Sequence, residues 1–167
     1  MKKTNIILIG MPGSGKSTIG VLLAKALKMK FLDTDLLIQE SDGRLLQEII
    51  DSDGLDAFID IEGKELEKIN VDNYVISTGG SAVYSTKAVQ HLKKNGIFLY
   101  LQLEYEEIEQ RISNITTRGI AMAPHQTLEE LYWERLPLYE GYADITINCS
   151  KSNTEDVIRK IMSALKN

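Results

Sequence analysis

The stretch that decides the fold is Gly10-Met11-Pro12-Gly13-Ser14-Gly15-Lys16-Ser17-Thr18. It fits the phosphate-loop pattern G-x-x-x-x-G-K-[S/T], in which glycines allow backbone angles that a side chain would forbid. An apolar run over residues 6–9 precedes it and an amphipathic segment follows it. The pattern therefore predicts a buried strand, a loop whose N–H groups face a phosphate, and a helix whose positive dipole end adds to the attraction.

The polar residues of this loop have separate expected tasks. Lys16 can reach the β- and γ-phosphates of ATP, and the Ser17 hydroxyl can ligate Mg²⁺. We expect Lys16 to be an exposed loop lysine. The alternative is a glycine-rich turn with a surface lysine. The expected nucleotide-binding residues of the loop are Gly13, Ser14, Gly15, Lys16, Ser17 and Thr18.

The rest of the chain alternates short apolar runs with amphipathic segments. We predict strands over residues 5–9, 31–33, 74–77, 97–101 and 145–148. We predict helices over residues 16–27, 36–40, 45–50, 57–69, 86–94, 106–113, 128–142 and 154–165. The alternation indicates one α/β domain over residues 1–167, a three-layer sandwich with a parallel sheet between helices. Residues 116–126 lack periodicity and form either a surface loop or a mobile lid.

Charge and composition exclude several classes of protein. The 167 residues carry a net charge of -5, which argues against a non-specific nucleic-acid binder. The single cysteine, Cys149, excludes a disulfide scaffold. No run approaches the roughly 20 apolar residues of a membrane span, and no signal peptide is evident. We expect a cytoplasmic monomer whose partners are small molecules, with no nucleic acid and no membrane.

Missing motifs narrow the choice among phosphate-loop proteins. The guanine-binding N-K-x-D motif of small GTPases is absent. The third predicted strand lacks the acidic end of motor ATPases, since it ends in Ser77 and continues as Thr78-Gly79-Gly80. The small size of the chain, the missing guanine motif and the possible lid together favour phosphoryl transfer to a small acceptor.

Two carboxylates follow the second predicted strand. Asp33 and Asp35 stand where the strand ends, and ligands of open α/β sheets bind at that edge. We assign Asp33 to the Mg²⁺ side and Asp35 to the acceptor hydroxyl, from which it can take a proton. The alternative for Asp35 is a structural helix cap.

At this point the sequence resembles the shikimate kinases, within the nucleoside-monophosphate-kinase-like group. The resemblance covers essentially the whole chain. It rests on the phosphate loop, Asp33-Thr34-Asp35, residues 54–62, Ser77-Thr78-Gly79-Gly80, Arg111, Arg118, and Arg135-Leu136-Pro137-Leu138-Tyr139. It implies a five-stranded parallel sheet of order 2-3-1-4-5, an acceptor-binding segment near residues 34–62 and a lid near residues 114–127. The implied reaction moves the γ-phosphoryl group of MgATP to the 3-hydroxyl of shikimate, in aromatic amino acid biosynthesis.

The resemblance also implies roles for individual residues. Asp35 would hold the acceptor hydroxyls, and Arg135 would bind the shikimate carboxylate. Arg118 would be the lid arginine at the transferring phosphate, and Arg111 would lie over adenine. Gly79 and Gly80 would let the backbone approach the substrate closely.

Each arginine also has a purely structural alternative. Arg111 can pair on the surface with Glu107, four residues before it. Arg118 can be a solvated loop cation, and Arg135 can pair with Glu134 or Glu140. We expect two further side chains, Glu62 and Tyr139, to be scaffold, and another two, Trp133 and Phe58, to be core or pocket wall.

The chain departs from the family pattern at three places. Ile59 stands where the family usually has an arginine that grips the substrate carboxylate, and Ser81 stands where it usually has a third glycine. The resemblance places both positions in the acceptor site. Arg118-Gly119-Ile120 lacks the proline-leucine that follows the lid arginine. Two alternatives therefore remain. One is a kinase of the same fold for another small hydroxylated acid or amino acid such as homoserine, and the other is a non-catalytic nucleotide-binding regulator.

Overall fold

The computed structural model describes residues 3–112 and 119–166, and within them five parallel strands form one sheet. The strands are β1 (Asn5–Ile9), β2 (Lys30–Asp33), β3 (Tyr74–Ser77), β4 (Gly96–Gln102) and β5 (Ile145–Asn148). Their spatial order is β2-β3-β1-β4-β5, which confirms the expected order.

Strand β1 lies at the centre of the sheet. It pairs in parallel with β3 on one side and β4 on the other, so that Ile7 lies opposite both Ile76 and Phe98. All five β1 residues are buried, as expected for a parallel strand covered by helices on both faces. The phosphate loop therefore leaves the sheet between the two strands on either side of it.

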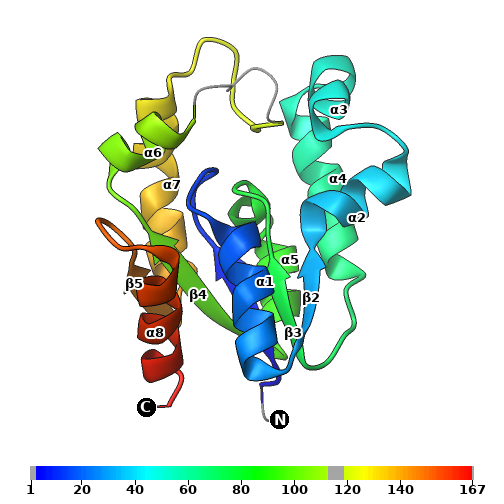
Figure 1. Ribbon diagram of the computed structural model, residues 1–167. Helices are drawn as coiled ribbons and strands as arrows, with labels where there is room; N and C mark the ends of the chain where they lie inside the picture. Colours follow the sequence, from blue (N-terminus) through cyan, green and yellow to red (C-terminus); the bar gives the residue numbers. More distant parts are fainter. Residues whose placement is uncertain (1–2, 113–118, 167) are drawn as a thin grey trace.

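Helices cover both faces of the sheet (Figure 1). Helices α1 (Lys16–Leu27) and α8 (Thr154–Ala164) pack against each other on one face. Helices α5 (Thr86–Lys93) and α7 (Leu128–Tyr142) lie against β4 on the other. The main hydrophobic core fills the space between these layers and the sheet. The structure thus confirms the predicted three-layer sandwich.

Three consecutive helices form a smaller unit beside the carboxyl end of β2. They are α2 (Thr34–Asp42), α3 (Leu46–Asp53) and α4 (Leu55–Glu67), and they have an apolar cluster of their own around Ile49 and Phe58. The Arg44 guanidinium ties the turn between α2 and α3 to Asp42 at 2.6 Å and Asp53 at 2.8 Å. These helices occupy the predicted acceptor-binding segment.

Several boundaries differ from the prediction because of capping. Helix α2 begins at Thr34 and not at residue 36, since the Asp33 side chain accepts a hydrogen bond from the Asp35 N–H and caps the helix. Helix α4 begins at Leu55 and not at residue 57, directly after Gly54 in a positive-φ conformation. Helix α8 begins at Thr154 as predicted, and the Asn153 side chain caps it.

Other boundaries differ from the prediction by one to three residues. Strands β2 and β4 start one residue earlier than predicted, and β4 also ends one residue later. Helix α3 spans Leu46–Asp53, and α4 ends at Glu67. Helices α5 and α8 end one residue earlier than predicted. Helix α6 covers Tyr105–Arg111, and the predicted end of its segment, residue 113, lies outside the described residues. A short 3₁₀ helix, η1 (Ala82–Tyr84), follows β3 and was not predicted.

Within the described residues, no helix combines the length and the apolar character needed to cross a membrane.

The contact of α1 with the sheet gives a test of packing. A Cβ on Gly20 would lie 2.5 Å from Cε2 of Phe31, so Gly20→Ala must displace that ring. We expect it to lower the free energy of unfolding by about 1–3 kcal/mol, measured by urea denaturation. The matched control is Gly141→Ala in α7, where a Cβ meets nothing within 4 Å. We expect that helical substitution to be neutral or stabilising, and equal losses for the two variants would contradict the packing argument.

Candidate active site

The phosphate loop has the backbone geometry that its glycines predict. Gly13 has φ 80° and Gly15 has φ 91°, both in the left-handed region that disfavours side chains. Gly15 directly precedes the first residue of α1, so the loop ends at a helix N-terminus. This arrangement suits an anion, because a helix N-terminus directs N–H groups and a positive dipole end toward it.

Lys16 lies differently from expectation. It is buried at 7% exposure, and its Nζ donates hydrogen bonds to the carbonyl oxygens of Gly10 at 2.7 Å and Met11 at 2.8 Å. The expectation of an exposed lysine is therefore wrong. The backbone carbonyls hold the ammonium group over the loop, which keeps a positive charge inside the protein next to the phosphate position.

The residues suited to a metal ion meet at the end of the loop. The Ser17 hydroxyl donates to Oδ2 of Asp33 at 2.8 Å and lies 3.4 Å from the Ser77 hydroxyl. A hydroxyl and a carboxylate are the hard oxygen donors that Mg²⁺ takes, together with water and substrate phosphates. The donor set therefore fits the Mg²⁺ expected at Ser17 and Asp33. No cluster of three acidic, His or Cys ligands occurs among the described residues.

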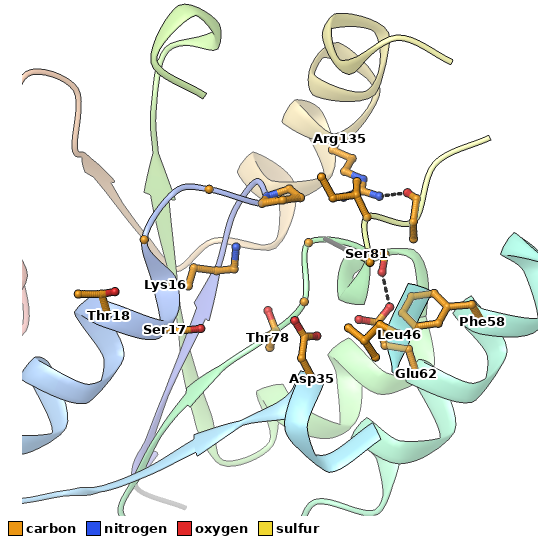
Figure 2. A pocket seen from close by; sticks show the side chains of 18 residues that line it. Lys16, Ser17, Thr18, Asp35, Leu46, Phe58, Glu62, Thr78, Ser81 and Arg135 are labelled. Atoms are coloured by element: carbon orange, nitrogen blue, oxygen red, sulfur yellow. Dashed lines mark hydrogen bonds between the residues drawn. The ribbon is translucent and has the colours of Figure 1, made fainter. Parts of the chain in front are cut away.

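A cavity of about 170 Å³ lies between the loop, the end of β3 and the α2–α4 unit (Figure 2). It brings together Lys16, Asp35, Gly79, Gly80 and Arg135, five residues singled out from the sequence. The Asp35 side chain points into the space between Lys16 and Glu62. A carboxylate, the phosphate loop and a buried guanidinium thus share one cavity.

Asp35 does not cap α2, because Asp33 performs that function. Partial burial, and then the neighbouring Asp33 carboxylate, raises the pKa of Asp35 to about 6, against the opposing charge of Lys16. Its carboxylate is ionised at neutral pH yet is a stronger base than an ordinary aspartate. This suits a group that accepts a hydroxyl proton.

Arg135 is fully buried, and it pairs with neither Glu134 nor Glu140. Its guanidinium donates to the Ala121 carbonyl and to the Tyr84 hydroxyl and lies over the Tyr84 ring at 5.3 Å. Within residues 3–112 and 119–166 it has no acidic partner within ion-pair distance. The expected ion pair of Arg135 with Glu134 or Glu140 is therefore wrong, and a buried positive charge faces the cavity, where it interacts electrostatically with the Glu62 carboxyl.

Arg111 borders a second, adjacent pocket. Its Nη1 donates to the Gly13 carbonyl at 3.4 Å, and its Nη2 lies 3.8 Å from Oε2 of Glu107. The surface pair with Glu107 therefore exists, but Arg111 also lines a pocket with Thr18 and Cys149. Arg118 and residues 113–117 lie outside the described residues, so the expected lid arginine has no described place. The described part of the expected lid begins at Gly119, and residues 119–121 line the main cavity.

Several residues of the cavity had no functional role assigned from the sequence. Glu62, expected to be scaffold, lines it together with Ser81, Thr78 and Leu46. Phe58 forms buried wall as expected, whereas Trp133 is 57% exposed and is neither core nor pocket wall. The signal for Ser81 was its place as a departure directly after two glycines. Ile59 is not among the lining residues and packs instead against the apolar cluster of α2–α4.

Two of the residues expected to shape the site do so from the backbone. A Cβ on Gly80 would lie 2.7 Å from Nη1 of Arg135, and one on Gly79 would lie 2.6 Å from Oε1 of Glu62. Only glycine therefore fits at these two positions without displacing a charged group. Tyr139, expected to be scaffold, donates to the Gly80 carbonyl at 2.7 Å and stacks on Tyr100.

Comparison with known proteins assigns the family. A family model described as shikimate kinase matches residues 12–166. The shikimate kinase of Haemophilus influenzae is 37% identical over 170 residues, covering 99% of this chain and 94% of its own.

The chain belongs to the shikimate kinase family. The shikimate kinase of Sulfurihydrogenibium is 34% identical over 163 residues, with 97% and 98% of the two chains covered. The structure of shikimate kinase from Acinetobacter baumannii in complex with shikimate superposes with a TM-score of 0.89 at 30% identity, covering 98% of this chain and 93% of that one. As a member of this family the protein is an ATP-dependent kinase of a small-molecule alcohol.

The buried carboxyl of Glu62 gives a pH prediction. Burial raises the pKa of Glu62 to about 7, against the hydrogen bond from Ser81. Between about pH 4.5 and pH 7 the folded protein therefore holds a proton that the unfolded chain releases, and Glu62 makes the protein less stable as the pH rises. Glu62→Gln removes this dependence. We expect its free energy of unfolding to exceed that of the wild type by roughly 1–3 kcal/mol at about pH 8 and by much less at about pH 5.

The measurement is urea denaturation of both proteins at the two pH values. The Asp35 carboxylate contributes to the raised pKa of Glu62, so the difference includes the coupling between these two carboxyl groups. A difference that is equal at both pH values would show that Glu62 keeps an ordinary pKa.

Proposed function

We propose that this protein transfers the γ-phosphoryl group of ATP to the 3-hydroxyl of shikimate, with Mg²⁺ as the metal cofactor. One observation carries the choice of acceptor: the buried Arg135 guanidinium, without an acidic partner among the described residues, lies in the same cavity as Asp35 and the phosphate loop. A buried cation is strongly favoured by a bound anion, and a planar guanidinium suits a carboxylate. A small acid that carries hydroxyl groups meets both requirements.

The proposed chemistry uses residues at both ends of the cavity. Asp35 accepts the proton of the acceptor hydroxyl, and the oxygen of that hydroxyl forms a bond to the γ-phosphorus. The bond from the γ-phosphorus to the β–γ bridging oxygen breaks, and ADP leaves. Lys16 stabilises negative charge on the phosphates, and Ser17 and Asp33 would hold Mg²⁺, which would neutralise more of it. Catalysis here is mainly positioning and charge stabilisation.

The remaining assignments follow the same scheme. Residues 34–62 would bind the acceptor, and residues 114–127 would form a lid that carries Arg118 to the transferring group and excludes water. Arg111 and the pocket beside it would hold adenine. We also propose that the protein acts as a single-domain cytoplasmic monomer in aromatic amino acid biosynthesis.

The role of Arg135 can be tested on the substrate side. We compare kcat/KM for shikimate, for its methyl ester and for homoserine in a coupled ADP-release assay. The ester lacks the charge that Arg135 would pair with. We therefore expect the wild-type kcat/KM for the ester to be roughly 10- to 100-fold lower than for shikimate, as the loss of a charge-assisted hydrogen bond predicts. Arg135→Met should lose most of this discrimination.

Because Arg135 is fully buried, Arg135→Lys serves as the control that keeps the charge, and thermal melting checks that both variants fold. Turnover of homoserine without turnover of shikimate would replace the proposed acceptor. Binding of ATP without any acceptor-stimulated ADP release would favour the regulator.

The two ends of the cavity should separate kinetically. We expect Asp35→Asn to lower kcat with the acceptor at least roughly 100-fold while the affinity for MgATP stays within a few-fold, because general-base catalysis contributes about that much. The wild-type pH profile of kcat/KM should fall as the pH drops below about 6, where Asp35 becomes protonated. Lys16→Met, by contrast, should impair MgATP binding and transfer together. If Asp35→Asn mainly weakened MgATP binding, Asp35 would belong to the metal site.

A further inference from the structure

One buried hydrogen bond in the cavity is unexplained by the chemistry above. Glu62 on α4 is 1% exposed, and Ser81 at the start of η1 is 4% exposed. The Ser81 hydroxyl donates to Oε2 of Glu62 at 2.5 Å (Figure 2). A fully buried carboxyl group is expensive unless its oxygens accept hydrogen bonds, so this contact stabilises the Glu62 carboxylate.

The other oxygen of the same carboxyl group has no partner in the described part of the chain. Oε1 of Glu62 is buried and accepts no hydrogen bond from residues 3–112 or 119–166. A buried acceptor left unsatisfied costs about 1–3 kcal/mol. An oxygen kept in this state inside a substrate cavity is suited to a donor that arrives with the substrate.

The position of Oε1 shows which part of the substrate it would meet. A Cβ on Gly79 would lie 2.6 Å from Oε1 of Glu62 and 2.8 Å from Oδ1 of Asp35. Both carboxylates therefore converge on the backbone of Gly79, and both line the cavity. A polyhydroxylated acceptor bound with one hydroxyl at Asp35 would bring a neighbouring hydroxyl to Glu62.

The donor to Glu62 has to come from outside α4. Ile59 precedes Glu62 by three residues and so lies on the same face of the helix, but it has no polar atom to offer. Ser81 supplies the donor from the segment after β3. Its backbone is fixed there, since its carbonyl accepts from Tyr84 N–H at 3.0 Å as η1 begins.

We propose that Ser81 is a positioning residue, whose hydroxyl holds Oε2 of Glu62 so that Oε1 receives a hydrogen bond from a non-reacting hydroxyl of the acceptor. The inference rests on the proposed function, because it needs a polyhydroxylated acceptor at Asp35. It assigns to Ser81 a part of acceptor recognition that Ile59 cannot perform in this chain.

The test measures a coupling between Ser81 and one substrate hydroxyl. We determine KM and kcat with shikimate and with analogues that each lack one non-reacting hydroxyl, for the wild type, Ser81→Ala and Ser81→Thr. Ser81→Ala should raise KM for shikimate roughly tenfold, as loss of one oriented hydrogen bond predicts, with the MgATP affinity unchanged. With the wild type, one analogue should have a KM roughly tenfold higher than that of shikimate. With Ser81→Ala, the KM of the same analogue should differ little from that of shikimate. Ser81→Thr, which keeps the hydroxyl, should retain most of the wild-type affinity for shikimate.

The matched control is Ser85→Ala. The Ser85 hydroxyl also lies close to α4, but it caps α5 by accepting a hydrogen bond from Ala88 N–H, so its loss should lower the melting temperature and leave KM unchanged. Ser81→Gly also removes the hydroxyl donor, so it is used in place of Ser81→Ala if the alanine variant does not fold. An unchanged KM in the variants without the hydroxyl, or an equal loss on every analogue, would overturn the proposal.

Failure of the proposed function gives a different result. If the wild type phosphorylates another acceptor and not shikimate, the proposed substrate is wrong, and the same comparison on that acceptor and its deoxy analogues decides the role of Ser81. If the wild type phosphorylates shikimate while Ser81→Ala and Ser81→Gly match it on every analogue, only the inference about Ser81 is wrong.

Discussion

The parallel pairing of β1 with both β3 and β4 is the constraint on which the site depends. It places the phosphate loop where the chain connections turn to opposite sides of the sheet, which is the position at which open α/β sheets bind ligands. Because β2 and β3 are parallel to β1, their carboxyl ends bring Asp33, Asp35 and Gly79 to the same edge. The parallel order of the strands is therefore enough to bring these residues together, although they lie far apart in the sequence.

Within this frame the charges are arranged by local burial and not by net charge. The protein is acidic overall, yet two of its cations, Lys16 and Arg135, are almost fully buried at the cavity. Backbone carbonyls hold Lys16, and a carbonyl, a hydroxyl and an aromatic face hold Arg135. Such neutral partners stabilise a buried cation through their dipoles.

The sequence was sufficient for features that depend on neighbouring residues. The phosphate loop, the five strands and most helix positions follow from glycine spacing and apolar periodicity. The contact of Ser81 with Glu62 joins residues 19 apart and exists only because α4 packs against η1. Arg135 and Trp133 lie in α7, where apolar and charged residues are spread around the helix, so the pattern did not show which face is buried. Tertiary packing determines the contact between Ser81 and Glu62, the burial of Arg135 and the exposure of Trp133.

The two departures from the family pattern, at positions 59 and 81, are related through Glu62. The side chain at 59 packs against the apolar cluster and does not line the cavity, whereas the side chain at 81 lines the cavity and donates to Glu62. A chain with isoleucine at 59 and glycine at 81 would leave both Glu62 oxygens without a donor from these two positions, at a cost of about 1–3 kcal/mol for each unsatisfied buried group. The two departures are therefore consistent as a pair. Ser81 reduces the cost of burying the Glu62 carboxyl, which Ile59 cannot do because it has no hydrogen-bond donor. The short side chain of Ser81, at the start of η1, thus keeps the acceptor side of the cavity polar.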